Sequence, residues 1–163
     1  MTQEYKELLL KDLCARLQYG VKFPTKVYFS PTEDFIDKVY TIRTINSDGT
    51  CRVDEDNGKT EFSIIWSVKP YLFPLSSMTK EQKEDLLLTV VGKEGLKLFS
   101  VTKDGIVSND KEEQSLNNFC FNIINFSNET TEAYIDWLNK NHFDYRGLIE
   151  KGLAIDATGL NIY

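Results

Sequence analysis

Residues able to do acid–base or nucleophilic chemistry are few and scattered in this 163-residue chain. His142 is the single histidine, so any Ser-His-Asp or Cys-His arrangement would have to use it. The pair Ser76-Ser77 lacks the flanking glycines of a hydrolase nucleophile elbow. The sequence therefore predicts no catalytic residue, and the simpler interpretation of His142 is a hydrogen-bonded residue at the end of a helix.

Metal-ligand spacing is also missing from the sequence. Cys14, Cys51 and Cys120 are far apart and form no CxxC pair. The acidic run 54–58 is similar to a calcium loop in composition, but aligning Gly58 with the loop glycine puts Val53 where the first carboxylate belongs. We expect no metal and no cofactor. The odd cysteine count indicates three free thiols in a reducing compartment.

Aromatic residues beside polar or cationic ones are the candidate binding residues. Aromatic residues make up 12% of the chain. Such pairs suit base stacking or a protein-interface hot spot, and they equally suit the edge of an ordinary core. The candidates are Trp137, His142, Tyr145, Arg146, Trp66, Tyr71 and Arg43.

The block 137–152 is the first choice among these candidates. Asp144 is placed to cap a short last helix, which puts Arg146 in the first turn, against the preference of the helix dipole. A cation there needs a partner, and the sequence leaves two open, Asp144 or an anionic ligand. In the first case the block belongs to the scaffold, and in the second it is a binding surface.

Composition bounds the class of protein. The chain is 41% hydrophobic and 27% charged, which suits one folded domain over residues 1–163. A net charge of −6 disfavours nucleic-acid binding, although an acidic surface that mimics nucleic acid stays an alternative. The sequence has no membrane-spanning apolar run and no signal peptide at its start, so we expect a cytoplasmic protein.

Periodicity predicts an α+β fold. Apolar residues at helical spacing predict an N-terminal helix that starts at Thr2 and stops at Gly20. Short alternating segments with tight turns predict a small antiparallel SH3-like barrel or curled sheet over about 18–78. The proline-containing segment 68–78 should be a buried strap or, alternatively, an exposed docking segment, and its prolines argue against a central strand.

The remaining part, about 79–163, should hold helices and a hairpin. Thr79 and Gln82 match a capping box that opens a helix. A hairpin is expected over 96–108, a strand over 119–126, a helix that ends at His142, and a short last helix over 145–151.

Three segments resemble a family of uncharacterised phage and prophage proteins of gut anaerobes. They are EYKELLLKDLCARL at 4–17, KPYLFPLSSM at 69–78 and WLNKNHFDYRGLIEKGLA at 137–154. The resemblance implies a mobile-element accessory protein in a bacterial cytoplasm and carries over no catalytic residue. We therefore expect a non-enzymatic binding protein, in a counter-defence role, that sequesters a host protein or a small nucleotide signal. Alternatives are a small enzyme without a recognisable motif and a virion structural or assembly component, and the sequence leaves the oligomeric state open.

Overall fold

The computed structural model describes residues 1–27, 36–55, 60–101, 105–108, 113–115 and 128–163. These residues form two compact units. Unit 1 comprises Met1–Pro74 and His142–Tyr163, and unit 2 comprises Leu75–Asn141. The expectation of a single domain over 1–163 stays a prediction, and each unit is described by itself.

Unit 1 begins with α1, Gln3–Arg16, followed by a 3₁₀ turn, Leu17–Tyr19. Thr2 caps the helix, because its hydroxyl accepts a hydrogen bond from the Tyr5 backbone N–H at 3.3 Å. Leu9 and Leu13 are fully buried. The predicted N-terminal helix, its cap and its apolar stripe are thus confirmed.

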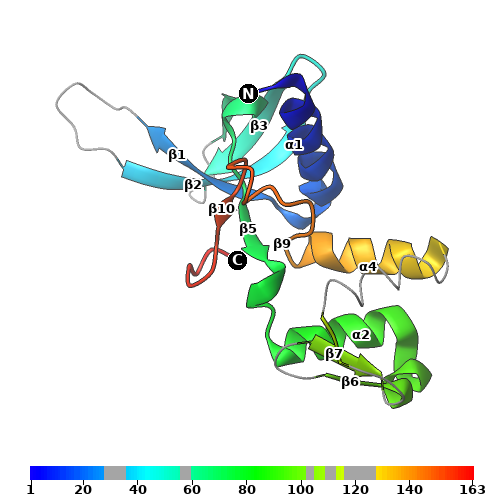
Figure 1. Cartoon of the computed structure of the whole chain (residues 1–163). Coiled ribbons are helices and arrows are strands. Elements are labelled where there is room, and N and C mark those ends of the chain that lie inside the picture. The colour runs from blue at the N-terminus through cyan, green and yellow to red at the C-terminus, as the bar shows by residue number, and fades with distance from the viewer. Residues whose placement is uncertain (28–35, 56–59, 102–104, 109–112, 116–127) are drawn as a thin grey trace. The chain divides into compact units, whose positions relative to one another are not determined.

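A curled antiparallel sheet follows α1 (Figure 1). Its strands β1 (Lys22–Val27), β2 (Ile36–Ile45), β3 (Thr50–Glu55) and β4 (Thr60–Ile64) pair in chain order. Buried side chains alternate with exposed ones along β3, where Cys51 and Val53 belong to the core and Arg52 is exposed. The α+β class and the curled sheet are confirmed, and the four strands form a half-barrel.

A second, parallel sheet of unit 1 joins segments that are far apart in sequence. Its order is β10 (Ile155–Asp156), β5 (Tyr71–Pro74) and β9 (Phe143–Asp144). The expectation that the prolines exclude a central strand is wrong, because β5 lies between β10 and β9. Pro70 and Pro74 stand on either side of residues 71–73, whose backbone N–H groups remain able to donate hydrogen bonds to the neighbouring segments. The Pro70 carbonyl accepts from the Ile155 N–H at 2.9 Å, and the Phe73 N–H donates to the His142 carbonyl at 2.9 Å. Val68 and Leu72 are fully buried, so in unit 1 the strap packs into the core.

The predicted short helix over 145–151 is wrong, because turns occupy these residues. Asp144 does act as a cap. Its two carboxylate oxygens accept hydrogen bonds from the backbone N–H groups of Leu148 and Ile149, at 2.9 and 2.8 Å. Gly147 lies at φ 67°, a left-handed conformation that no regular helix contains. The local capping signal was therefore correct, but it stabilises a turn.

Unit 2 contains two helices, a 3₁₀ turn at each end of the first one, and a hairpin-based sheet. The elements are η3 (Leu75–Ser77), α2 (Lys80–Gly95), η4 (Leu96–Leu98), β6 (Phe99–Val101), β7 (Gly105–Ser108), β8 (Glu113–Ser115) and α4 (Asn128–Lys140). Thr79 and Gln82 form the predicted capping box, since each backbone N–H donates to the other's side chain, at 2.8 and 3.3 Å. The expected hairpin is confirmed as the pair of β6 with β7, but residues 96–98, which were expected to belong to it, form η4. The strand expected over 119–126 lies outside the described residues.

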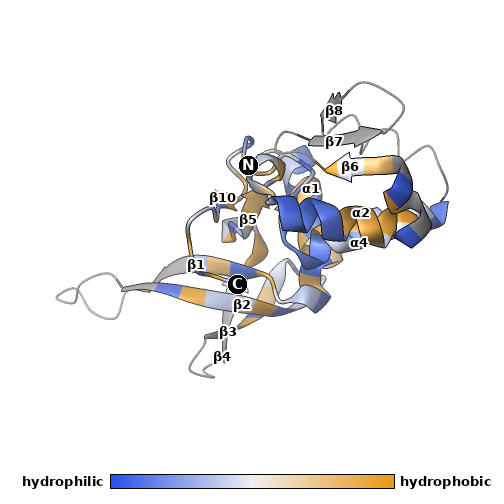
Figure 2. Ribbon diagram, turned by 90° about the horizontal axis from the view of Figure 1, so that it is seen from below, coloured by the Kyte–Doolittle hydropathy of each residue, from blue (hydrophilic) through white to orange (hydrophobic). Residues whose placement is uncertain are grey.

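The core of unit 2 forms between α2 and α4. Leu87, Tyr134 and Leu138 are buried, and Figure 2 shows that α2 carries both hydrophobic and hydrophilic residues. The Trp137 indole N–H donates to the Asp85 carboxylate at 2.7 Å. In the described part of the chain, no helix has both the length and the apolar character to cross a bilayer.

Candidate functional site

The predicted site residues divide between three places. Tyr71 lies on β5 of the second sheet of unit 1, His142 directly precedes β9, and Tyr145 and Arg146 directly follow β9. Trp66 and Arg43 lie elsewhere in unit 1, and Trp137 is a buried residue of unit 2. The structure therefore places four of the seven in or directly beside the second sheet of unit 1.

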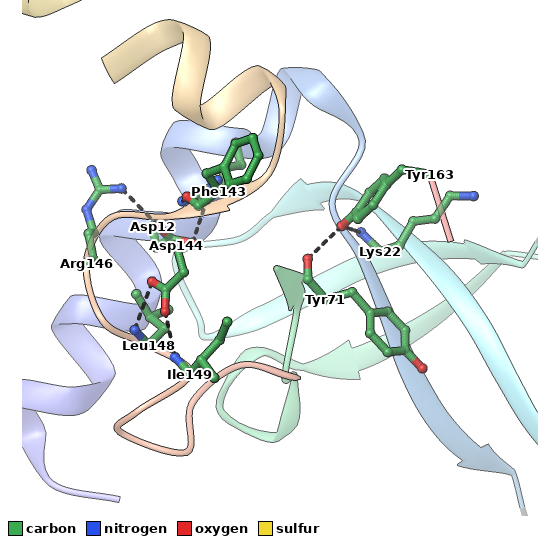
Figure 3. A network of polar contacts seen from close by, with 10 residues as sticks. Asp12, Lys22, Tyr71, Phe143, Asp144, Arg146, Leu148, Ile149 and Tyr163 are labelled. Atoms are coloured by element: carbon green, nitrogen blue, oxygen red, sulfur yellow. Dashed lines mark hydrogen bonds and ion pairs between the residues drawn. The ribbon is translucent and has the colours of Figure 1, made fainter. Parts of the chain in front are cut away.

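A buried ionic network fastens residues 143–146 to α1 (Figure 3). Asp12 accepts a hydrogen bond from Arg16 Nε at 2.8 Å and one from Arg146 Nη1 at 2.9 Å. Arg16 Nη2 donates in addition to the Phe143 carbonyl at 2.7 Å. The side chains of Asp12 and Arg16 are completely buried, while 14% of the Arg146 side chain is exposed. Removing one partner from such a buried ion pair is strongly destabilising, because the charge that remains stays buried.

The ion-pair partner of Arg146 is Asp12, and not Asp144 or an anionic ligand, the two partners that the sequence left open. Asp144 bonds to the backbone of Leu148 and Ile149, and Arg146 pairs with Asp12, which is 134 positions away. The Arg146 guanidinium also lies over the Tyr145 ring, 4.3 Å from its centre. Sequence reasoning missed Asp12 and Arg16. A signal for them existed, because both occupy the helix face marked by Leu9 and Leu13.

His142 is a buried residue in an unusual backbone conformation. Only 5% of it is exposed, and among the described residues it is the one non-glycine residue with positive φ, at 57°. Its Nδ1 has no hydrogen-bond partner, while the Tyr19 backbone bonds to the ring. Burial, followed by the charge of Arg16, lowers the pKa of His142 to about 4. The imidazole is therefore neutral at physiological pH, and it differs from the satisfied helix-end residue that the sequence predicts.

Tyr163 covers this histidine. The two rings are stacked, with centres 3.7 Å apart and planes 12° apart. The Tyr163 hydroxyl donates to the Tyr71 carbonyl at 2.9 Å and accepts from the Lys22 N–H at 3.2 Å (Figure 3). Burial raises the pKa of Tyr163 to about 12, so the hydroxyl keeps its proton. Sequence reasoning also missed Tyr163, for which no local pattern gives a signal.

Arg43 lies on the outward side of the curled sheet together with Arg52 and Ile64, and we call these three residues the arginine face. Arg43 Nε is 2.9 Å and Arg52 Nε is 4.0 Å from the Asp54 carboxylate. The two arginine side chains are 55% and 51% exposed, and Ile64 is 60% exposed. Two cations thus converge on one carboxylate.

Both tryptophans pack against the rest of their own unit. Trp66 is half-buried against the core of unit 1, with Lys6 Nζ 5.5 Å from the centre of its ring. Trp137 is buried and bonded to Asp85 within unit 2. Their assignment as binding residues stays a prediction.

Comparison of the chain with protein-family models, with curated proteins and with solved structures gives no match. Within the described residues, no three His, Cys, Asp or Glu side chains come together in a group that could hold a metal ion.

Proposed function

We propose that the chain is a phage- or prophage-encoded accessory protein that acts by binding a host protein through the arginine face. The observation that carries this proposal is the convergence of half-exposed Arg43 and Arg52 on the single carboxylate of Asp54. Each guanidinium has five N–H donors, more than one carboxylate can accept. The pair therefore keeps donors and positive charge for an acidic group of a partner.

The shape and composition of this face favour a protein partner. Its residues lie on adjacent strands of an open sheet, whereas small ligands usually take concave sites. Arginine is enriched among interface hot spots, and exposed Ile64 adds apolar area to the same surface. Because the whole chain has a net charge of −6, the arginine face is a local exception that would select a negatively charged surface.

The polar groups near His142 support binding rather than catalysis. Asp12 is bonded to two arginines, Asp144 to two backbone N–H groups, and His142 is neutral and buried. A general acid or base must reach the proton that it transfers. Asp12 and Asp144 are better placed to stabilise the fold of unit 1.

A small nucleotide is the second candidate ligand, since Arg146 lies against the aromatic face of Tyr145. A nucleotide phosphate there would have to compete with the buried carboxylate of Asp12 for the same guanidinium. The protein partner is therefore the stronger proposal. Given the resemblance to phage proteins, a component of the host's defence is the first class of partner to test.

Affinity capture from a bacterial host lysate, followed by mass spectrometry, tests this proposal. We expect one host protein to be captured in stoichiometric amount by the wild type and lost with Arg43→Ala/Arg52→Ala. Lys69→Ala is the matched control, because Lys69 is an exposed cation of unit 1 outside the arginine face. Equal capture by the double variant would reject the arginine face. Calorimetric titration with a nucleotide panel would identify the second candidate if the Arg146→Ala variant alone loses binding.

A further inference from the structure

Unit 1 holds the side chain of Tyr163 in a site that recognises both its ring and its hydroxyl. The ring stacks on His142 and contacts Phe73 at 6.1 Å between centres. The hydroxyl meets one backbone donor on β1, at Lys22, and one backbone acceptor on β5, at Tyr71. We call these groups, the His142 and Phe73 rings with the Lys22 N–H and the Tyr71 carbonyl, the phenol slot.

We propose that the phenol slot is a recognition site for tyrosine side chains, which Tyr163 occupies within its own chain and from which a tyrosine of a protein partner displaces it. This surface differs from the arginine face, and the inference does not depend on it. Occupation by Tyr163 shows that a phenol fits. The question is which features make the site selective and which allow exchange.

Selectivity follows from the two backbone groups. A hydroxyl that donates to one strand and accepts from another satisfies both, whereas a phenylalanine ring would leave both without a partner. Sites built to hydrogen-bond a hydroxyl reject the analogue that lacks it much more strongly than apolar pockets reject a methylene. Because the hydroxyl must both donate and accept, the site selects a neutral phenol.

His142 provides independent evidence that this place is more than scaffold. Its ring is nine-tenths buried, its backbone is at positive φ, and its Nδ1 has no partner. The Tyr19 backbone bonds to the ring, and Nδ1 is a buried polar atom without a hydrogen-bond partner. Strained backbone and unsatisfied buried polar groups concentrate at ligand sites.

The segment that carries Tyr163 is suited to exchange. The backbone of this segment is joined to β5 by the hydrogen bond from the Ala157 N–H to the Leu72 carbonyl, at 2.8 Å. A turn follows, in which the Leu160 N–H donates to the Ala157 carbonyl. Residues 158–161 are exposed, and 43% of Tyr163 itself is exposed. Beyond Leu160, the contacts described for this segment are those of the Tyr163 side chain.

Emptying the slot and offering it a free phenol tests the proposal. In Tyr163→Ala, we expect p-cresol to bind and to shift the amide resonances of Lys22 and Leu72, whose peptide groups line the slot. Toluene, which lacks the hydroxyl, should bind at least about fivefold more weakly, because two hydrogen bonds are missing. Leu160→Ala, a change at another exposed residue of the same segment, should bind p-cresol no better than the wild type does.

Two further arms keep the test decisive. Tyr163→Phe retains the ring but not the hydroxyl, so p-cresol should displace it more readily than it displaces the wild-type tyrosine. This comparison decides the matter if Tyr163→Ala does not fold. Binding of p-cresol no tighter than toluene, or no tighter to either variant than to the wild type, would overturn the proposal. Sedimentation of the wild type as a dimer that Tyr163→Ala abolishes would assign the slot to a second copy and overturn the choice of a partner's tyrosine.

The proposals for the phenol slot and for the arginine face can be rejected separately. Binding of p-cresol is measured without any partner, and Arg43→Ala/Arg52→Ala should leave it unchanged. Undiminished host-protein capture by Arg43→Ala/Arg52→Ala, together with an intact p-cresol response, would reject only the arginine face.

Discussion

Removing the carboxylate of Asp12 should strongly destabilise unit 1. Its two oxygens bind Arg16 and Arg146 at 2.8 and 2.9 Å, and neither the Asp12 nor the Arg16 side chain is exposed. In Asp12→Ala, the buried Arg16 guanidinium loses the carboxylate with which it forms an ion pair. Breaking a buried pair in this way costs about 3–5 kcal/mol of unfolding free energy. That loss is a large part of the roughly 5–15 kcal/mol that stabilises an ordinary protein.

The same network sets the expected order of three variants. Arg146→Ala removes a partly exposed partner and leaves the Asp12–Arg16 pair, so we expect a smaller loss of about 1–2 kcal/mol. Glu7→Ala, which removes an exposed hydrogen bond with Gln3 on the same helix, should stay within about 0.5 kcal/mol. The order Asp12→Ala, Arg146→Ala, Glu7→Ala is therefore the signature of a buried network.

Urea unfolding measures this order. Each unit contains one tryptophan, Trp66 in unit 1 and Trp137 in unit 2. In a Trp137→Phe background, fluorescence of Trp66 then reports the unfolding of unit 1 alone. A loss below about 1 kcal/mol for Asp12→Ala would refute the reasoning. So would an Arg146→Ala variant that is as stable as its parent.

Three other predictions follow from the described residues. The pKa of His142 is lowered from 6.5 in the unfolded chain to about 4 in the fold, so the unfolded chain takes up a proton first as the pH falls. The free energy of unfolding should therefore decrease by up to about 3 kcal/mol between about pH 7 and pH 4, and His142→Asn should flatten this pH dependence of urea unfolding. A thiol reagent should titrate three thiols under denaturing, non-reducing conditions, and in the folded protein Cys14 should react long before buried Cys51; finding one thiol would contradict this. Gly49→Ala should lower the melting temperature more than Gly159→Ala, because both lie at positive φ but only the Gly49 Cβ would come within 3.3 Å of a neighbouring ring; equal shifts would show that this contact is unimportant.

The elements that the sequence predicted correctly depend on local signals. The Thr2 cap and the Thr79–Gln82 capping box each act within a few residues, so their patterns are visible without knowledge of the fold. The curled sheet was predictable for the same reason, since its strands pair in chain order through short turns.

The second sheet and the candidate site depend on contacts across long sequence distances. β9 and β10 have two residues each, too few to show a period, and they pair with β5 about 70 to 85 positions away. The nearest carboxylate to Arg146 in sequence is Asp144, but its true partner is Asp12. Proximity in sequence was therefore a poor guide to ion pairs, because tertiary packing decides which charges meet.

The proposed function is tested most directly by the dissociation constant of the captured host protein for purified variants. If Arg43 and Arg52 each contribute about 1–2 kcal/mol as interface hot spots, the double alanine variant should bind about 30-fold to about 700-fold more weakly than the wild type. Lys69→Ala should bind as the wild type does. An affinity of the double variant within about threefold of the wild type would contradict the arginine face as the binding surface.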